Sequence, residues 1–255
     1  TLFRSFSTHN VNLVYTYLPT SADKTYFLPP TLTNGNVHGI IVLNVYNERL
    51  LRLLAETQIP KVFLDTSSLV APDELNGDLL LMESRTSVRR ITCHLLEQGR
   101  TLPGFIGDIS YAQSNRERYE GFCQALADAG KKVDSSLCLT TPLGIDTYRE
   151  EIDTFLSSLS RMPDAFVCAS DYVACILMQL LEKRGLRVPE DVAVSGFDNN
   201  TEDLLAEHLT TVQVFNEELG ARLALQILYR IKYPNTPHEI TYLGTNVLYR
   251  DSTGD

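Results

Sequence analysis

Short apolar runs and amphipathic stretches alternate along most of the chain. The runs have the length and composition of strands buried on both faces, whereas in the amphipathic stretches apolar residues recur at helical spacing. Predicted strands cover residues 11–18, 38–45, 62–65, 104–108, 137–140, 165–169, 192–194 and 240–249. Predicted helices cover residues 48–58, 85–98, 114–130, 146–159, 172–184 and 216–232, and residues 1–10 resemble the end of a helix. This order predicts βαβ units and parallel sheets covered by helices.

The number of βα units is high for one sheet and favours two similar α/β lobes. The chain has 255 residues, which is enough for two lobes with cores of their own. The strand at residues 104–108 is the expected place for the chain to leave the first lobe.

Composition and charge narrow the class of protein. The chain is 44% hydrophobic and 21% charged, as in ordinary soluble proteins, and its net charge of −10 disfavours binding to nucleic acid or anionic membranes. A DNA-reading part, if there is one, is therefore expected outside this chain. No signal peptide or membrane-spanning stretch is visible in the sequence. The five cysteines lack metal-site spacing, so we expect reduced thiols, a cytoplasmic protein and no metal or cofactor.

Polar residues follow several predicted buried strands. The clearest case is Asp198, which closes Gly196-Phe197-Asp198-Asn199 directly after the apolar run 192–194. In open α/β sheets the carboxyl ends of strands form the ligand-binding edge, although Asp is also common there as a turn former or helix cap. The other polar ends are Asp65, Asp108, Ser170 and Asp171, of which Asp108 is a weaker candidate and Asp171 resembles a helix cap. Several carboxylates at one edge suit a polyhydroxylated ligand.

Motifs for catalysis are missing from the sequence. It contains no Gly-x-Ser-x-Gly elbow, no P-loop and no Gly-x-Gly-x-x-Gly turn, and its five histidines are scattered. Paired carboxylates could serve a glycosidase, but the sequence gives no pair a defined separation. We therefore do not expect an enzyme.

Five motifs stand in a characteristic order along the chain. They are Arg118-Tyr119-Glu120-Gly121-Phe122, Pro163-Asp164-Ala165-Phe166 through Ser170-Asp171, Arg184-Gly185-Leu186-Arg187-Val188-Pro189-Glu190-Asp191-Val192-Ala193-Val194, Gly196-Phe197-Asp198-Asn199, and Leu209-Thr210-Thr211-Val212 followed by Glu218-Leu219-Gly220. This set resembles the effector-binding region of the lactose/galactose repressor (LacI/GalR) family of bacterial transcription regulators, and the order and spacing agree from about residue 36 to the end.

The resemblance implies a fold like that of type I periplasmic binding proteins. Two flavodoxin-like lobes with parallel sheets would be joined by three crossovers and enclose a ligand cleft. The N-terminal lobe is then expected to hold residues 1–108 and about 216–238, and the C-terminal lobe about 109–215 and 239–255. The resemblance also implies a homodimer and a helix-turn-helix domain preceding this chain, which would bind operator DNA.

Particular residues match effector contacts of the family. The resemblance implies that Arg118 and Asp198 bind the effector, as does Asp65 in sugar-responsive members, with a contribution from Ser170, where the family typically has Asn. Ser114 corresponds to a polar cleft residue, but the pattern Ser114–Glu117 is equally a capping box. Phe197 or Tyr111 could stack on a sugar, although Phe197 also suits the core.

The sequence departs from the family at its beginning, because the family's first strand and the start of its first helix have no match.

We expect a cytoplasmic, dimeric, sugar-responsive regulator, most simply a repressor, that makes no contact with membranes. Two alternatives stay open. An extracytoplasmic sugar receptor of a transporter would share the fold, but the unpaired cysteines and the signature between residues 187 and 212 count against it. A sugar-processing enzyme would need catalytic residues, and the sequence shows no such set.

Overall fold

The computed structural model describes residues 6, 11–144, 146–199 and 207–254. The chain divides into two compact units. The first comprises Thr1–Met82, Tyr111–Ser114 and Phe215–Gly244, and the second comprises Glu83–Ser110, Asn115–Val214 and Thr245–Asp255. The fold is α/β with parallel sheets, as the sequence predicts.

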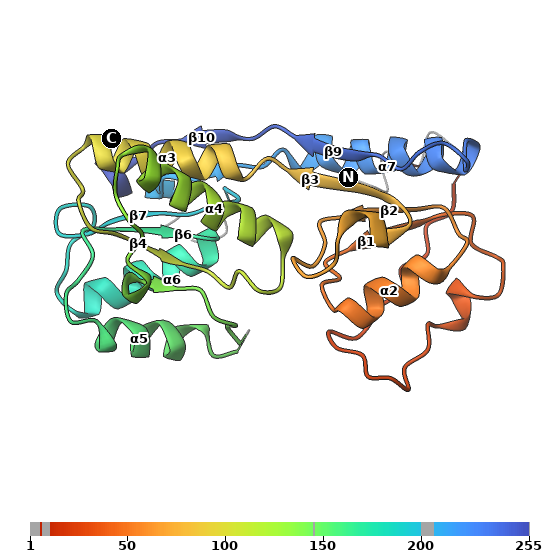
Figure 1. Cartoon of the computed structure of the whole chain (residues 1–255), viewed down its shortest axis with the longest axis horizontal. Coiled ribbons are helices and arrows are strands. Elements are labelled where there is room, and N and C mark those ends of the chain that lie inside the picture. Colours follow the sequence, from red (N-terminus) through yellow and green to blue (C-terminus); the bar gives the residue numbers. More distant parts are fainter. Residues whose placement is uncertain (1–5, 7–10, 145, 200–206, 255) are drawn as a thin grey trace. The chain divides into compact units, whose positions relative to one another are not determined.

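The sheet of the first unit has the order β1-β2-β3-β9 and is parallel throughout. Its strands are β1 (Ile40–Leu43), β2 (Lys61–Leu64), β3 (Asp78–Met82) and β9 (Ile240–Leu243). The helices are α2 (Glu48–Glu56) and α7 (Asn216–Lys232), with short 3-10 turns at Pro30–Leu32 and Pro72–Leu75. Figure 1 shows this unit with α2 in orange and α7 in blue.

Strand register places the two helices of the first unit on opposite faces of its sheet. Val42 pairs with Phe63 and Phe63 with Leu79, so these side chains share one face, and they form one core cluster with leucines of α2. The other face lies under α7, whose Ile227 approaches Gly39 so closely that a Cβ there would lie 2.9 Å from it. The unit is thus a helix–sheet–helix sandwich.

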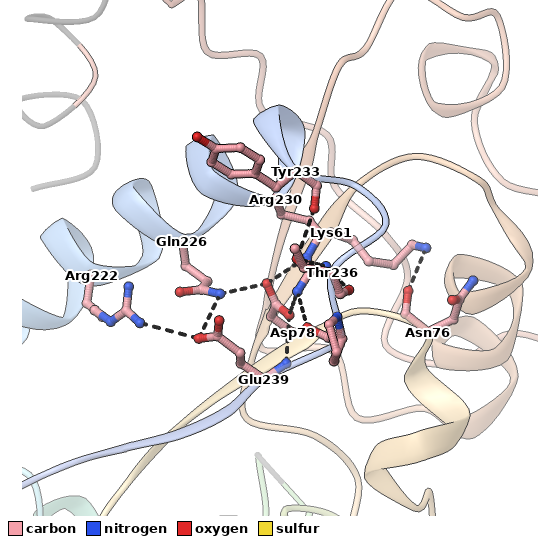
Figure 2. A network of polar contacts seen from close by, with 10 residues as sticks. Lys61, Asn76, Asp78, Arg222, Gln226, Arg230, Tyr233, Thr236 and Glu239 are labelled. Carbon is pink, nitrogen blue, oxygen red and sulfur yellow. Dashed lines mark hydrogen bonds and ion pairs between the residues drawn. The ribbon is translucent and has the colours of Figure 1, made fainter.

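The first unit is fastened at the amino ends of its strands by a buried polar network (Figure 2). Asp78 begins β3, and its carboxylate accepts hydrogen bonds from Arg230 and Gln226 of α7 and from the backbone N–H of Glu239, just before β9. Lys61, the first residue of β2, donates from Nζ to the backbone carbonyls of Thr57 and Asn76. The network ties α7 and β9 to the start of the sheet.

The second unit contains a parallel sheet with the order β5-β4-β6-β7. Its strands are β4 (Pro103–Ile106), β5 (Cys138–Leu139), β6 (Ala165–Cys168) and β7 (Ala193–Ser195), and β8 (Thr211–Gln213) pairs antiparallel with β10 (Asn246–Leu248). The helices are α3 (Arg85–Glu97), α4 (Gln113–Asp128), α5 (Tyr148–Ser158) and α6 (Asp171–Lys183), with 3-10 turns at Ser135–Leu137 and Asp251–Thr253. The core is built largely from β6, β7 and the buried face of α6.

The structure corrects the predicted lobe boundaries. Glu83–Ser110 belongs to the second unit, because β4 pairs with β5 and β6. The chain therefore leaves the first unit after β3 and not at residues 104–108. The last segment also divides differently, because residues up to Gly244 stay in the first unit, where β9 pairs with β3.

The predicted strand at residues 11–18 is wrong. The segment has no regular secondary structure, and Val14, Tyr15 and Tyr17 are exposed. Among the described residues no strand pairs with it, and an apolar pattern without a partner strand does not form a ladder. The predicted helix end at residues 1–10 lies outside the described residues, apart from Phe6. No helix in the described part of the chain is long and apolar enough to cross a membrane.

Candidate effector-binding site

In the second unit, three of the predicted polar ends follow neighbouring parallel strands. Asp108 follows β4, Ser170 follows β6 and Asp198 follows β7. Since β4, β6 and β7 are adjacent and parallel, these residues lie at the same edge of the sheet. This edge is the candidate site, and its side chains differ in their exposure and in their hydrogen-bond partners within the protein.

Asp198 presents its carboxylate at this edge. Its side chain is 45% exposed, and Oδ1 lies 3.6 Å from Nη2 of Arg118. Burial raises the pKa of Asp198, and the charge of Arg118 acts in the opposite direction. The backbone has a φ of 112°, a conformation that non-glycine residues rarely adopt and that must be held by surrounding contacts.

Arg118 of α4 is buried, with only 5% of its surface exposed. Its Nη1 donates to the backbone carbonyl of Ala169 at 2.5 Å and to Oδ1 of Asn115 at 3.3 Å. Its Cζ lies 3.7 Å from the ring centroid of Phe197, a cation–π contact. Among the described residues, the buried Nε has no hydrogen-bond acceptor. The guanidinium is thus fixed through Nη1, while the buried Nε has no acceptor within the part of the chain that the structure describes.

Phe197 is not offered to a ligand. Its side chain is completely buried, and Arg118 covers one face of its ring. The ligand-stacking role suggested by the sequence is therefore wrong for Phe197, whereas the core role is confirmed. Tyr111, the other stacking candidate, belongs to the first unit, is 38% exposed and packs edge-on against Tyr46.

Ser170 and Asp171 begin α6. Ser170 is the N-cap, and its Oγ accepts a hydrogen bond from the backbone N–H of Val173, which leaves the hydroxyl hydrogen free to be donated. Asp171 is the first helical residue and not the cap, and its buried carboxylate accepts from Oγ1 of Thr211. Asp108 has a local role, because Oδ1 accepts from the N–H and the hydroxyl of Ser110 in a turn.

In the first unit, Asp65 and Ser114 contact each other. Ser114 donates from Oγ to Oδ2 of Asp65 at 2.6 Å and from its N–H to Oδ1 at 3.3 Å, and Thr66 N–H also donates to Oδ1. Both side chains are buried. Because α4 begins at Gln113, Ser114 lies inside the helix and is not the cap of a capping box; Asp65 is the carboxylate at this helix end. An effector contact of Asp65 stays a prediction.

Sequence reasoning missed the residues that fix Arg118. Asn115 accepts from Arg118 and donates from Nδ2 to the backbone carbonyl of Asp108, so it connects the arginine to the end of β4. The spacing of Asn115 and Arg118 by three positions on one helix was an available signal. The role of the Ala169 carbonyl had no signal in the sequence, since every residue has a backbone carbonyl. Among the described residues, no group of three or more metal-ligating side chains is present.

Comparisons with known proteins agree with this geometry. The family described as "periplasmic binding protein-like domain" matches residues 92–253. The HTH-type transcriptional repressor PurR of Aliivibrio fischeri is 29% identical over 225 residues, which cover 87% of this chain and 66% of PurR. DegA of Bacillus subtilis, an HTH-type transcriptional regulator, is 31% identical over 170 residues, covering 66% of this chain and 48% of DegA.

Among solved structures, the transcriptional regulator CelR in complex with cellobiose has a TM-score of 0.78 and 27% identity, and the match covers 87% of this chain and 68% of CelR. The chain thus spans about two thirds or less of the length of the curated relatives named above. It belongs to the periplasmic binding protein-like domain family, in the form of the effector-binding domain of LacI/GalR-type regulators.

Proposed function

We propose that this chain is the ligand-sensing domain of a transcriptional regulator, most simply a repressor, and that it binds a neutral, polyhydroxylated effector through Arg118 and Asp198. The observation that carries the proposal is the pair itself. A guanidinium fixed by Ala169, Asn115 and Phe197 has a buried Nε without an acceptor among the described residues, and it lies beside a half-exposed carboxylate.

The pair offers complementary hydrogen bonds to a ligand with neighbouring hydroxyl groups. Arg118 can donate only, and the ionised carboxylate of Asp198 can accept only, whereas a hydroxyl group does both. A hydrogen bond to a charged partner contributes about 1.5–3 kcal/mol, so a few such contacts support micromolar to millimolar affinity after the cost of association. Ser170 can add a donor from its hydroxyl group.

The relatives support a sensor more than a transport receptor or an enzyme. PurR, DegA and CelR are named as transcriptional regulators, and the CelR structure contains cellobiose, a disaccharide of the proposed ligand class. We accordingly propose a cytoplasmic homodimer that reaches operator DNA through a helix-turn-helix domain preceding this region. For the effector to control DNA binding, it must bind one conformation of the regulator more tightly than another.

The experiment is calorimetric titration of the protein with cellobiose and a panel of neutral mono- and disaccharides. We expect at least one sugar to bind, and Asp198→Asn and Arg118→Met to weaken that binding at least about tenfold. Asp191→Asn is the matched control, because Asp191 lies in the same unit and pairs with Arg187 at the surface. Unchanged affinity in Asp198→Asn would overturn the site, and turnover of a bound sugar would overturn the role as a sensor.

A further inference from the structure

The turn that carries Asp198 has an unusual backbone. Asp198 and Asn199 are consecutive non-glycine residues with positive φ, at 112° and 52°. The main chain of Asp198 forms a parallel β-bridge with Gln213, and its N–H donates to the carbonyl of Val212 at 3.0 Å. Such a conformation persists only where neighbouring groups determine it. The question is which groups hold the carboxylate beside Arg118.

Asn199 holds the turn further, through both its backbone and its side chain. Its N–H donates to Oγ1 of Thr211 at 3.3 Å, and its Nδ2 donates to Oε1 of Gln213 at 2.5 Å. Its Oδ1 accepts from Nη2 of Arg250 at 2.8 Å. The amide of Asn199 is therefore bonded at both of its polar atoms, which fixes the rotation of the turn that follows Asp198.

Arg250 is itself anchored to the strand beside this turn. Its Nη1 donates to the carbonyl of Leu209 at 3.0 Å, and its backbone N–H donates to Oγ1 of Thr210 at 2.8 Å. Arg250 follows β10, so its side chain connects the C-terminal segment to the residue next to Asp198. The planar guanidinium bonds two groups at once in a fixed geometry, which a lysine cannot reproduce.

We propose that Arg250 and Asn199 are positioning residues for the effector-binding carboxylate: through their mutual hydrogen bond they hold the Asp198–Asn199 turn so that Asp198 stays beside Arg118. The proposal rests on the proposed function for its consequence in effector binding. The positioning itself concerns the free protein, so it can be tested without a ligand.

The test compares the wild type with Arg250→Met, Arg250→Lys and Asn199→Ala by NMR titration of the Asp198 carboxyl group and by calorimetry with cellobiose. Arg187→Met is the matched control, because Arg187 is an exposed arginine of the same unit that pairs with Asp191. We expect Arg250→Met and Asn199→Ala to move the pKa of Asp198 toward its ordinary value and to weaken cellobiose binding about tenfold or more, with Arg250→Lys in between. Arg187→Met should change neither quantity.

A merely structural role would lower the melting temperature of these variants without moving the pKa of Asp198. The positioning role is therefore overturned if Asp198 has the same pKa in folded Arg250→Lys and Asn199→Ala as in the wild type. This holds even if Arg250→Met does not fold. Failure of the wild type to bind cellobiose or any sugar of the panel counts against the proposed effector class, whereas the titration still decides the role of Arg250 and Asn199.

Discussion

Asp78 and Arg230 form a bidentate ion pair in which both side chains are only 2% exposed. Arg230 donates from Nη2 to Oδ1 at 2.6 Å and from Nε to Oδ2 at 3.0 Å, and Figure 2 shows the pair between α7 and the start of β3. Burial alone would raise the pKa of Asp78, but hydrogen bonds from Arg230, Gln226 and the N–H of Glu239 outweigh it and lower the pKa. The pair joins α7, β3 and β9 at a single carboxylate.

Replacing one partner of this pair should destabilise the first unit severely. Arg230→Met leaves a buried carboxylate without its cation, which typically costs about 3–5 kcal/mol of unfolding free energy. The double variant Asp78→Leu/Arg230→Met should cost less than the sum of the single changes, because it removes the buried charge together with its partner. Urea denaturation of the wild type, Asp78→Leu, Arg230→Met and the double variant measures both effects.

The exposed pair of Arg52 and Glu74 in the same unit provides the control for this cycle. Their side chains are 45% and 40% exposed, so Arg52→Met should change the unfolding free energy far less than Arg230→Met does. Equal effects of Arg52→Met and Arg230→Met would show that burial of the Asp78–Arg230 pair does not determine its contribution.

Lys61 should make stability depend on pH above neutrality. Its Nζ is buried and bonded to two backbone carbonyls, and burial lowers the pKa of the amine from 10.5 to about 8. Between these two values the unfolded chain binds the proton and the folded chain has released it, so the contribution of Lys61 to stability rises with pH across this window. The whole effect is about 3.4 kcal/mol at most, at 1.36 kcal/mol for each pKa unit.

The measurement is the difference in unfolding free energy between the wild type and Lys61→Met at several pH values from 7.5 to 10.5. The unfolding free energy of the wild type should rise relative to that of the variant as pH rises, since only the wild type carries the buried amine. Lys24→Met, which replaces an exposed lysine of the same unit, controls for the loss of a lysine charge. A constant difference for Lys61→Met would mean that the amine keeps an ordinary pKa.

The sequence predicted the fold class and the polar ends of the parallel strands in the second unit well, because both follow from local patterns. Apolar runs ending in polar residues placed Ser170 and Asp198 at the ends of β6 and β7, as the structure has them. Periodicity could not reveal tertiary partners. The carbonyl of Ala169 that fixes Arg118 lies 51 positions away and has no side-chain signal, and the exposed segment 11–18 has a strand pattern but no partner strand among the described residues.

The same limit explains the error in the lobe boundary and the uncertain role of Asp65. Whether β4 continues the first sheet or begins a second one depends on its pairing with β6, which no local pattern encodes. Likewise, the sequence placed Asp65 after a strand, but its bonds to Ser114 depend on the approach of α4 in space. Strand ends predict where a side chain lies, whereas its hydrogen-bond partner is decided by packing.

Ser170 has a stabilising role as the N-cap of α6, and this role can be tested without a ligand. Ser170→Ala removes the acceptor for the N–H of Val173 and should lower the unfolding free energy by about 1 kcal/mol. Ser170→Asn keeps an acceptor of equal capping quality, so stability should be retained. Thermal and urea denaturation of both variants check this, and a similar loss of stability in both would contradict the capping role.

Gly121 should be intolerant of even one methyl group, which gives a physical reason for glycine within the motif Arg118-Tyr119-Glu120-Gly121-Phe122. A Cβ at this position of α4 would lie 2.2 Å from the carbonyl oxygen of Arg85 and 3.0 Å from its carbonyl carbon, so backbone would have to move at the start of α3. Gly121→Ala should therefore destabilise the second unit by about 1–3 kcal/mol, although alanine alone favours a helix by about 1 kcal/mol over glycine. Gln124→Ala on the exposed side of the same helix controls for helix propensity and should change stability little. Urea denaturation decides the matter, because a Gly121→Ala protein as stable as the wild type would show that α4 and α3 do not approach each other this closely in solution.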